Sequence, residues 1–363
     1  MKTRKINRSE TKRSMTRKVA SAAAADNEEA ETDDSTGTPE KYNNDLQLFY
    51  LARPVYGGWV SFTAHLALKH NLPLYKIGNR TEATKEGKPK YREYGYGVKY
   101  QNISVKDIPS GKLLITAIDK TCYDHLEKFP NGTYIVIHDP TEVTSEATKP
   151  LVEQLKRFKI ITIRESVKDY LKEKLKLESL FLRHPFYEYK YEKSENPSEA
   201  VSISRIDFDK HTDIILKANK ELKKPIKIYG AHNRLYVFHK LKDLGFKKYY
   251  EGQFEKSFKE LSGILSDAKF VVDMSVIKHD GGGTQYTFLE AIYQKCCLVI
   301  NEKWVEGFKT PFVNGKNCYV VKESSDLAKL INSNPSVQKI NTEAYKILEP
   351  HIKINWLNAV KNY

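Results

Sequence analysis

A glycine-rich segment that follows an apolar run carries the strongest chemical signal in the sequence. The segment Asp280–Ile292 reads DGGGTQYTFLEAI, follows the apolar run Phe270–Met274, and has apolar residues at helical spacing from Phe288 onward. Strand, glycine-rich loop and helix in this order direct backbone N–H groups and a positive helix end at one point. The consecutive glycines, among them Gly282 and Gly283, also permit a ligand to approach the backbone closely. The pattern predicts a phosphate or other anion site, and for this loop alone a flexible connection before an ordinary amphipathic helix explains it equally well.

A second candidate anion site lies upstream, at the end of the predicted strand Ala200–Ile206. Arg205 leaves the end of this strand, and Lys210 lies in the first turn of the helix that follows, which Asp207 or Asp209 can cap. A guanidinium fork and an ammonium point charge beside a helix N-terminus can clamp a diphosphate. A pair of solvated surface charges is the alternative explanation when this segment is taken alone.

Together, the two segments resemble the C-terminal half of a GT-B glycosyltransferase of the large retaining family that uses nucleotide-sugar donors. In that family an Arg and a Lys five positions later hold the donor diphosphate, and Arg205 and Lys210 match this spacing. A glutamate in the later helix binds the nucleotide ribose, and Glu290 matches it. A first family glutamate, eight positions earlier, would fall on Gly282, so this match fails and Asp280 is the nearest acidic substitute for contacting the sugar hydroxyls.

The resemblance also implies how the leaving diphosphate is stabilised. Arg205, Lys210 and the N–H groups around Tyr286–Phe288 supply preorganised positive charge without a metal ion. Retention of configuration is implied by the resemblance, and the sequence offers no convincing nucleophile. The residues assigned to donor binding are Gly57, Gly58, Arg205, Lys210, Asp280, Gly282, Gly283, Thr284, Tyr286, Thr287 and Glu290.

The N-terminal half contributes a turn and a histidine. Gly57-Gly58 follows the predicted first strand Leu46–Ala52, where the family brings backbone against the donor sugar and acceptor, although any tight strand-to-helix turn can use glycine. The predicted strand Tyr134–His138 ends in His138 at the sheet edge where open α/β sheets place ligands. The resemblance places His138 beside the reacting carbon of the sugar, as a catalytic residue with Arg205 and Lys210. A histidine satisfied by local backbone is the alternative.

Alternating strand and helix patterns must position these residues. Predicted strands are Leu46–Ala52, Leu113–Ile118, Tyr134–His138, Ile160–Arg164, Ser179–Arg183, Ala200–Ile206, Ile226–Tyr229, Phe270–Met274, Leu298–Asn301 and Cys318–Val321. Predicted helices are Tyr123–Phe129, Thr148–Phe158, Val167–Leu175, Thr212–Leu222, Leu235–Leu244, Phe254–Leu265, Thr287–Gln294 and a final helix around Tyr345–Val360. The alternation predicts parallel, doubly wound sheets. With the resemblance it predicts an α/β protein of the GT-B fold, with two facing Rossmann-like domains and a cleft between them.

The predicted domain organisation has five parts. They are a disordered tail at 1–42, an N-terminal Rossmann-like acceptor domain at 43–189, a linker at 190–198, a C-terminal donor domain at 199–340, and a C-terminal helix at 341–363 that returns to the first domain. The tail is basic, then alanine-rich, then acidic, and has few residues able to build a core. The basic start precedes no apolar stretch and no segment is long enough to span a membrane, so we expect a cytoplasmic protein.

Net charge and composition limit the classes of partner that the sequence suggests. Residues 1–40 hold eight Lys/Arg and eight Asp/Glu, so the formal net charge of +14 belongs to the folded part and favours anionic partners. The best nucleic-acid candidates are Lys85–Lys99, which interleaves lysines with tyrosines, and Lys242–Lys248. The four cysteines lack paired zinc spacing, and no acidic pair suggests a manganese site. We therefore expect no metal and no cofactor, with the nucleotide-sugar as a substrate whose nucleotide, UDP or GDP, stays open.

Three functions remain open from the sequence. The leading one is a hexosyltransferase that acts on a glycan or glycoprotein acceptor. The second is a DNA-base glucosyltransferase, because phage DNA alpha-glucosyltransferases are loosely similar, with a Tyr-Thr-x-Leu-Glu run in place of Tyr286–Glu290. The third is an inactive nucleotide- or polyanion-binding protein of the same fold, motivated by the missing first glutamate. The sugar, the acceptor and the oligomeric state stay undecided.

Overall fold

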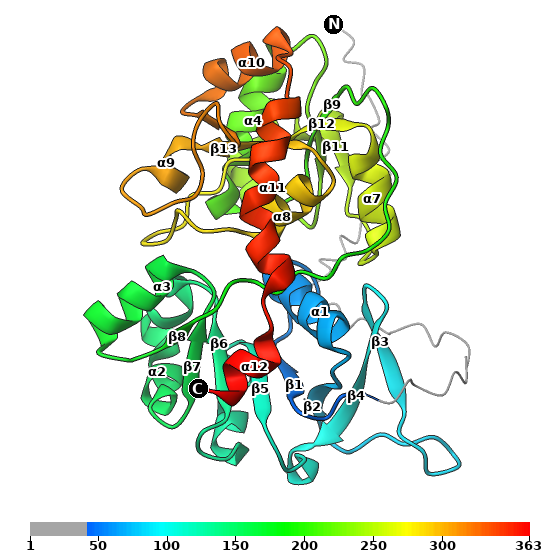
Figure 1. The fold of residues 1–363 in the computed structure, drawn as a ribbon, viewed down its shortest axis with the longest axis vertical. Helices are drawn as coiled ribbons and strands as arrows, with labels where there is room; N and C mark the ends of the chain where they lie inside the picture. The colour runs from blue at the N-terminus through cyan, green and yellow to red at the C-terminus, as the bar shows by residue number, and fades with distance from the viewer. Residues whose placement is uncertain (1–41) are drawn as a thin grey trace, which may run out of the picture. The chain divides into compact units, whose positions relative to one another are not determined.

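Two β-sheets organise the part of the chain that the computed structural model describes, residues 42–363 (Figure 1). The predicted tail at 1–42 lies outside these residues except for its last position. Across the first sheet, the strands are β3 (Tyr91–Gly95), β4 (Val98–Ser104), β2 (Leu74–Gly78), β1 (Gln47–Leu51), β5 (Leu113–Ile118), β6 (Tyr134–Ile137), β7 (Lys159–Thr162) and β8 (Leu180–Phe181). Across the second, they are β11 (Tyr250–Gly252), β10 (Lys227–Tyr229), β9 (Glu199–Ser202), β12 (Ala268–Asp273), β13 (Cys297–Asn301) and β14 (Tyr319–Val321).

Parallel pairing explains why the central strands β5 and β13 are buried along their whole length. Among the strand pairs of residues 42–363, β3 with β4 is the antiparallel one, and the others are parallel. Helices cover both faces of a parallel sheet, so every residue of β5 and of β13 is buried. Strand order reverses between β1 and β5 in the first sheet, and between β9 and β12 in the second. Open α/β sheets bind ligands beyond the carboxyl ends of strands at such points.

Helices and helical turns connect these strands. The α-helices are α1 (Gly58–His70), α2 (Lys149–Leu155), α3 (Glu165–Tyr170), α4 (Thr212–Asn219), α5 (Arg234–Tyr236), α6 (Phe246–Tyr249), α7 (Phe258–Ser266), α8 (Tyr286–Tyr293), α9 (Glu302–Val305), α10 (Ser324–Ser333), α11 (Gln338–Lys353) and α12 (Trp356–Lys361). The shorter 3₁₀ and π turns are η1 (Val105–Asp107), η2 (Tyr123–Lys128), η3 (Pro140–Val143), η4 (Glu146–Thr148), η5 (Leu171–Leu175), η6 (Phe208–Lys210), η7 (Val237–Leu241) and η8 (Lys242–Leu244). No helix within 42–363 combines the length and the apolar character needed to cross a bilayer.

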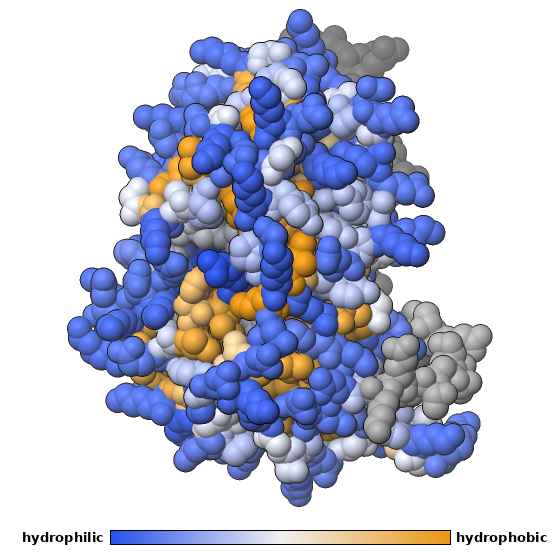
Figure 2. Space-filling model, in the orientation of Figure 1, coloured by the Kyte–Doolittle hydropathy of each residue, from blue (hydrophilic) through white to orange (hydrophobic). Residues whose placement is uncertain are grey.

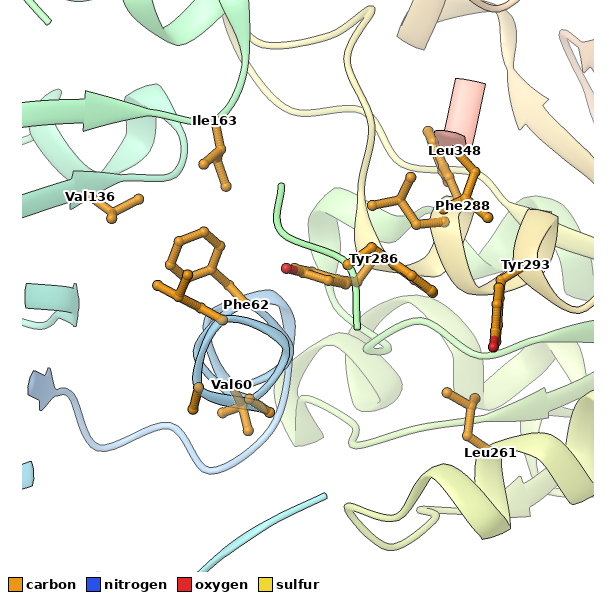
Figure 3. Packing of buried hydrophobic residues seen from close by; sticks show 14 of the residues in the cluster. Val60, Phe62, Val136, Ile163, Leu261, Tyr286, Phe288, Tyr293 and Leu348 are labelled. Carbon is orange, nitrogen blue, oxygen red and sulfur yellow. The ribbon is translucent and has the colours of Figure 1, made fainter. Parts of the chain in front are cut away.

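One hydrophobic core cluster joins the two halves of the chain. Its buried residues come from both sheets, from α1 and α8, and from the last two helices. Figure 3 shows Tyr286 projecting from α8 toward Phe62 of α1. Figure 1 shows α11 running from the upper sheet toward the lower, where α12 lies. The phenol of Tyr134 on β6 donates to the carbonyl of Val360 at 2.7 Å, and Trp356 donates to the carbonyl of Arg183 at 3.0 Å.

Several predicted elements differ from the structure. The helix predicted over Leu235–Leu244 is broken into α5, η7 and η8. The strand predicted over Ser179–Arg183 contains only the short β8, and the prediction has no counterpart for β2, β3, β4 or β11. The basic stretch Lys85–Lys99 includes β3 and the start of β4, an antiparallel hairpin at the sheet edge. The division into separate domains at 190–198 stays a prediction.

Candidate functional site

Lys210 connects the two candidate anion sites. Its Nζ donates to Oγ of Ser275 at 2.7 Å and to Oε1 of Gln285 at 2.8 Å. Ser275 follows β12, and Gln285 is the N-cap residue of α8. The first N–H groups of a helix have no intrahelical acceptors, so they add partial positive charge where this ammonium lies. The ammonium of Lys210 and the N-terminus of α8 therefore place positive charge together, near the position where strand order reverses between β9 and β12.

Arg205, five residues before Lys210, lies on the surface and pairs with two carboxylates. Its guanidinium is 3.1 Å from Asp207 and 3.2 Å from Asp209, and its side chain is 47% exposed. Asp207 also accepts from Asn233 at 3.0 Å, so this carboxylate is held in place. An exposed guanidinium on carboxylates can exchange them for the oxygens of a diphosphate, which have similar geometry.

The three glycines of the loop pack against protein. A Cβ at Gly281 would lie 2.6 Å from the ring of Phe308, and one at Gly282 would lie 2.5 Å from the carbonyl oxygen of Lys309. Gly283 would place its Cβ 2.7 Å from the side chain of Arg164. Steric contact with neighbouring protein groups therefore excludes a side chain at each position, and close approach of a ligand to this loop stays a prediction.

Asp280 is buried in an ion pair with Arg164, which follows β7. Nε of Arg164 donates to Oδ1 of Asp280 at 3.0 Å, and Nη2 of Arg164 lies 2.6 Å from Oδ2 in the ion pair. The hydroxyl of Ser166 also donates to Oδ1 of Asp280, at 2.6 Å. Burial raises the pKa of Asp280, and the positive charge of Arg164 opposes this shift. Arg164 also donates to the carbonyl of His138, so it brings His138 and Asp280 together. Protein donors occupy Oδ1 of Asp280, and a contact between this carboxylate and the sugar hydroxyls stays a prediction.

The imidazole of His138 is satisfied by backbone. Nε2 donates to the carbonyl of Thr116 at 2.7 Å, and burial lowers the pKa of His138 to about 4. The backbone N–H of His138 donates to Glu142 at 3.1 Å, and the other oxygen of Glu142 accepts from Trp59 at 2.8 Å. The geometry agrees with the alternative in which local backbone satisfies this histidine, and a contact with sugar stays a prediction.

The turn before α1 is open. Gly57 and Gly58 are exposed, and a Cβ added to either would meet no atom within 4 Å in the described part of the chain. Gly57 has φ of 106°, a conformation that favours glycine, and its carbonyl accepts from Val60 at 3.0 Å. Trp59 ties this turn to η3 through Glu142. The backbone at Gly57-Gly58 is therefore accessible to a ligand.

Glu290 lies in a buried network between α8, α1 and the chain after β8. Its side chain accepts from Nε2 of His65 at 2.9 Å and from the phenol of Tyr189. The backbone N–H of Tyr187 donates to Nδ1 of His65 at 2.9 Å, which fixes the tautomer that donates to Glu290. Glu290 is only 4% exposed, so protein surrounds its carboxylate. A ribose contact at Glu290, which stays a prediction, would have to replace these two donors.

The remaining predicted residues lie around the start of α8. Tyr286 is buried, stacks on His65 with ring centroids 4.7 Å apart, and donates to the carbonyl of Pro185 at 2.7 Å. Oγ1 of Thr284 lies 3.2 Å from Nδ1 of His184. The half-buried Thr287 follows in the first turn. Tyr286 and Thr284 thus contribute to packing through their side chains, and their backbone is what remains for a ligand.

Sequence analysis missed the partners of these residues. Arg164 ends the predicted strand Ile160–Arg164, and the strand-end rule that selects His138 would have selected it as well. Ser275, Gln285 and His65 become recognisable only when segments distant in sequence are brought together. In the described residues, no group of three or more His, Cys, Asp or Glu side chains is arranged to hold a metal ion.

Comparison with known proteins finds similarity in structure only. The sequence matches no protein-family profile and no curated protein. A structure of HepE from Anabaena in complex with UDP-glucose superposes with a TM-score of 0.62 at 13% identity, covering 87% of this chain and 97% of HepE. An alpha-glucosyltransferase in complex with UDP and a 13-mer DNA containing a HMU base gives 0.61 at 14% identity, covering 85% and 95%.

A longer protein shares the same core arrangement. A variant of TarM from S. aureus, in complex with fondaparinux, alpha-GlcNAc-glycerol and UDP, gives a TM-score of 0.51 at 15% identity. The alignment covers 69% of this chain, which spans about half (54%) of the length of TarM. At these identities the likeness concerns the fold. The chain therefore has the GT-B fold, with two Rossmann-like halves.

Proposed function

We propose that this protein is a nucleotide-sugar-dependent hexosyltransferase that acts on a glycan or protein-linked acceptor, with retention of configuration and without a metal ion. The observation that carries the proposal is the contact of Lys210 with Ser275 and Gln285. It joins two anion motifs from separate segments at the start of α8, where an open α/β sheet binds its ligand.

The chemistry of transfer suits this arrangement. Negative charge develops on the diphosphate as its bond to the sugar breaks, and Lys210, Arg205 and the first N–H groups of α8 are fixed positive groups that can stabilise it. The backbone at Gly57-Gly58 is free to contact the sugar or the acceptor. UDP is the nucleotide we favour, because the HepE, alpha-glucosyltransferase and TarM structures each contain UDP or UDP-glucose.

A panel of nucleotide-sugars tests the proposal. Thermal unfolding of the full chain is measured with UDP, GDP and their glucose, N-acetylglucosamine and mannose conjugates, because a bound donor raises the unfolding temperature. The best stabiliser is then tested for slow hydrolysis of its sugar. Stabilisation by UDP-sugars with hydrolysis supports the proposal. Stabilisation without hydrolysis or transfer would favour the inactive binding protein, and no stabilisation by any donor would contradict both.

A DNA-base glucosyltransferase is the second candidate, because the chain covers most of an alpha-glucosyltransferase whose structure contains DNA. The basic residues Lys88 and Lys90 precede the hairpin of β3 and β4 at the sheet edge. If they contact DNA phosphates, duplex binding falls steeply with salt, and Lys88→Glu with Lys90→Glu flattens the slope by about 0.9 per lost contact. Transfer of sugar to hydroxymethylated DNA would establish this function. Weak, salt-sensitive binding without transfer would favour the glycan acceptor.

A further inference from the structure

A cavity separate from the Lys210 site opens between the two halves. It has a volume of about 570 Å³ and is bounded by the ends of β7 and β8, by Gly281–Thr284, by the chain after α9 and by α11. Within the described residues, its lining includes neither Arg205, Lys210, Ser275 nor Gln285. The cavity therefore uses none of the side chains around Lys210, although it is lined by Gly282, Gly283 and Thr284, which the sequence assigns to donor binding.

The cavity combines an apolar floor with a cationic rim. Ile163, Phe181 and Ile347 supply apolar surface. On the face in Figure 2, such surface lies between α3 and the lower end of α11, bordered by hydrophilic residues. Five Arg or Lys side chains and two Glu side chains line the cavity, so positive charge prevails. The lining His351 adds no charge at neutral pH, because burial lowers its pKa to about 4.

Two of the cations have no direct contact with a carboxylate in the described residues, although the charge of Lys316 contributes to lowering the pKa of Glu343. Lys309 pairs with Glu165 at 2.8 Å, Lys346 pairs with Glu343 at 2.6 Å, and Arg164 pairs with Asp280. By contrast, the exposed side chains of Arg183 and Lys316 form no hydrogen bond or ion pair with any residue of the described range 42–363. Two unpaired cations at one rim match the charge of a phosphate monoester, which is close to −2. An Arg can hold such a group through two parallel bonds, and a Lys adds a point charge.

We infer that this cavity is a second anion site that binds a small phosphomonoester, with the phosphate on Arg183 and Lys316 and the organic part on Phe181 and Ile347. Sugar phosphates are the simplest members of this class, because a pyranose ring presents C–H surface to an aromatic floor. The site contacts both halves and α11, so an occupant would favour the arrangement in which the halves are together. This inference does not depend on the proposed transferase activity.

Calorimetric titration of the full chain with glucose 6-phosphate tests the inference, with glucose as the neutral control. We expect binding of glucose 6-phosphate but not of glucose, and retention of this binding in Lys210→Ala and in the presence of saturating UDP. Arg183→Gln combined with Lys316→Gln should weaken it at least about tenfold, since both charge-assisted contacts are lost. Lys329→Gln, at an exposed lysine of α10, is the matched control and should change nothing.

Three outcomes would overturn the inference. The first is no binding of glucose 6-phosphate at millimolar concentration, and the second is equal binding of glucose. The third is binding of glucose 6-phosphate that UDP displaces and Lys210→Ala abolishes, but that the variant Arg183→Gln, Lys316→Gln retains. UDP affinity of the double variant is measured in parallel and should equal that of the unmodified protein. A chain that binds glucose 6-phosphate but no nucleotide would contradict the proposed function and leave this site standing.

Discussion

Nε2 of His65 lies 2.9 Å from Oε1 of Glu290, so a helix of the first half donates directly to the carboxylate that the family resemblance assigns to ribose. Tyr189 occupies the other oxygen. Both partners are buried, and the backbone of Tyr187 fixes the tautomer of His65. The contact gives Glu290 a structural role that needs no ligand, because a buried carboxylate requires donors for its oxygens.

Replacing Glu290 by Gln tests this role against ribose binding. The amide of Gln has the same shape, but it has only one acceptor oxygen for the two donors, His65 and Tyr189. One donor loses its acceptor, so we expect the free energy of unfolding to fall by about 1–3 kcal/mol. UDP affinity should be unchanged. Urea unfolding and calorimetry measure the two quantities, with Glu349→Gln on the exposed side of α11 as the control. A large loss of UDP affinity at unchanged stability would instead support the ribose contact.

Lys210→Ala should weaken UDP binding and slow donor hydrolysis together. The variant removes the ammonium that links Ser275 to Gln285, and one charge-assisted contact is worth about 1.5–3 kcal/mol, or roughly tenfold to a hundredfold in affinity. Lys217→Ala is a matched control, because Lys217 lies on the nearby α4 and pairs with Asp213 at the surface. Equal UDP affinity in both variants would show that the diphosphate binds elsewhere.

The ion pair of Arg164 and Asp280 predicts a large effect on stability. Asp280→Asn leaves Arg164 as an uncompensated buried charge, which costs about 3–5 kcal/mol. The double variant Arg164→Met, Asp280→Leu should recover most of that loss, because an apolar pair of similar size needs no desolvation of charge. Urea unfolding of the single and double variants measures the coupling. A stable Asp280→Asn protein with little turnover would point to a sugar contact.

Buried histidines should make the fold sensitive to acid. Burial lowers the pKa of His138 and of His351 to about 4, below the ordinary value near 6.5. Between these values the unfolded chain binds more protons than the folded one, so stability falls as the pH falls from about 6.5 to 4. Each such histidine adds up to about 1.4 kcal/mol per pH unit to this slope.

Urea unfolding between pH 7 and pH 4 measures that slope. His351→Gln should reduce it, and His239→Gln, at an exposed histidine, should leave it unaltered. A slope that His351→Gln does not change would mean that the pKa of His351 is the same in the folded and the unfolded chain. Above pH 7 neither variant should differ from the parent in the pH dependence of its stability.

The sequence was sufficient to predict the elements that are buried on both faces. Leu113–Ile118 is apolar except for Thr116, and β5 has the same limits. The hairpin of β3 and β4 was missed because Tyr91–Gly95 has two adjacent charged residues between its tyrosines and no alternating pattern, and it lies at a sheet edge. The helix predicted over Leu235–Leu244 has the right periodicity, but its middle forms the π turn η7.

For the candidate site, motif spacing located the cations but not their surroundings. Arg205 and Lys210 were selected from a strand end and a helix start, which are local features. Lys210 contacts Ser275 and Gln285, which lie more than sixty residues further along the chain. These contacts therefore depend on the order of strands in the sheet. The burial of Glu290 was not predictable, because its partner His65 is an interior residue of an apolar helix.

The single core cluster that joins the two halves limits how this protein can be recombined with its structural neighbours. Exchange of one half for that of another GT-B protein would place foreign side chains against α1, α8 and α12, where the core is continuous. Such chimeras should be insoluble unless the whole interface, including the segment that leads to β9, is transplanted as one piece. The smallest part of this chain that could be exchanged without disrupting the core is therefore both sheets together with the helices that pack between them, and not either sheet alone.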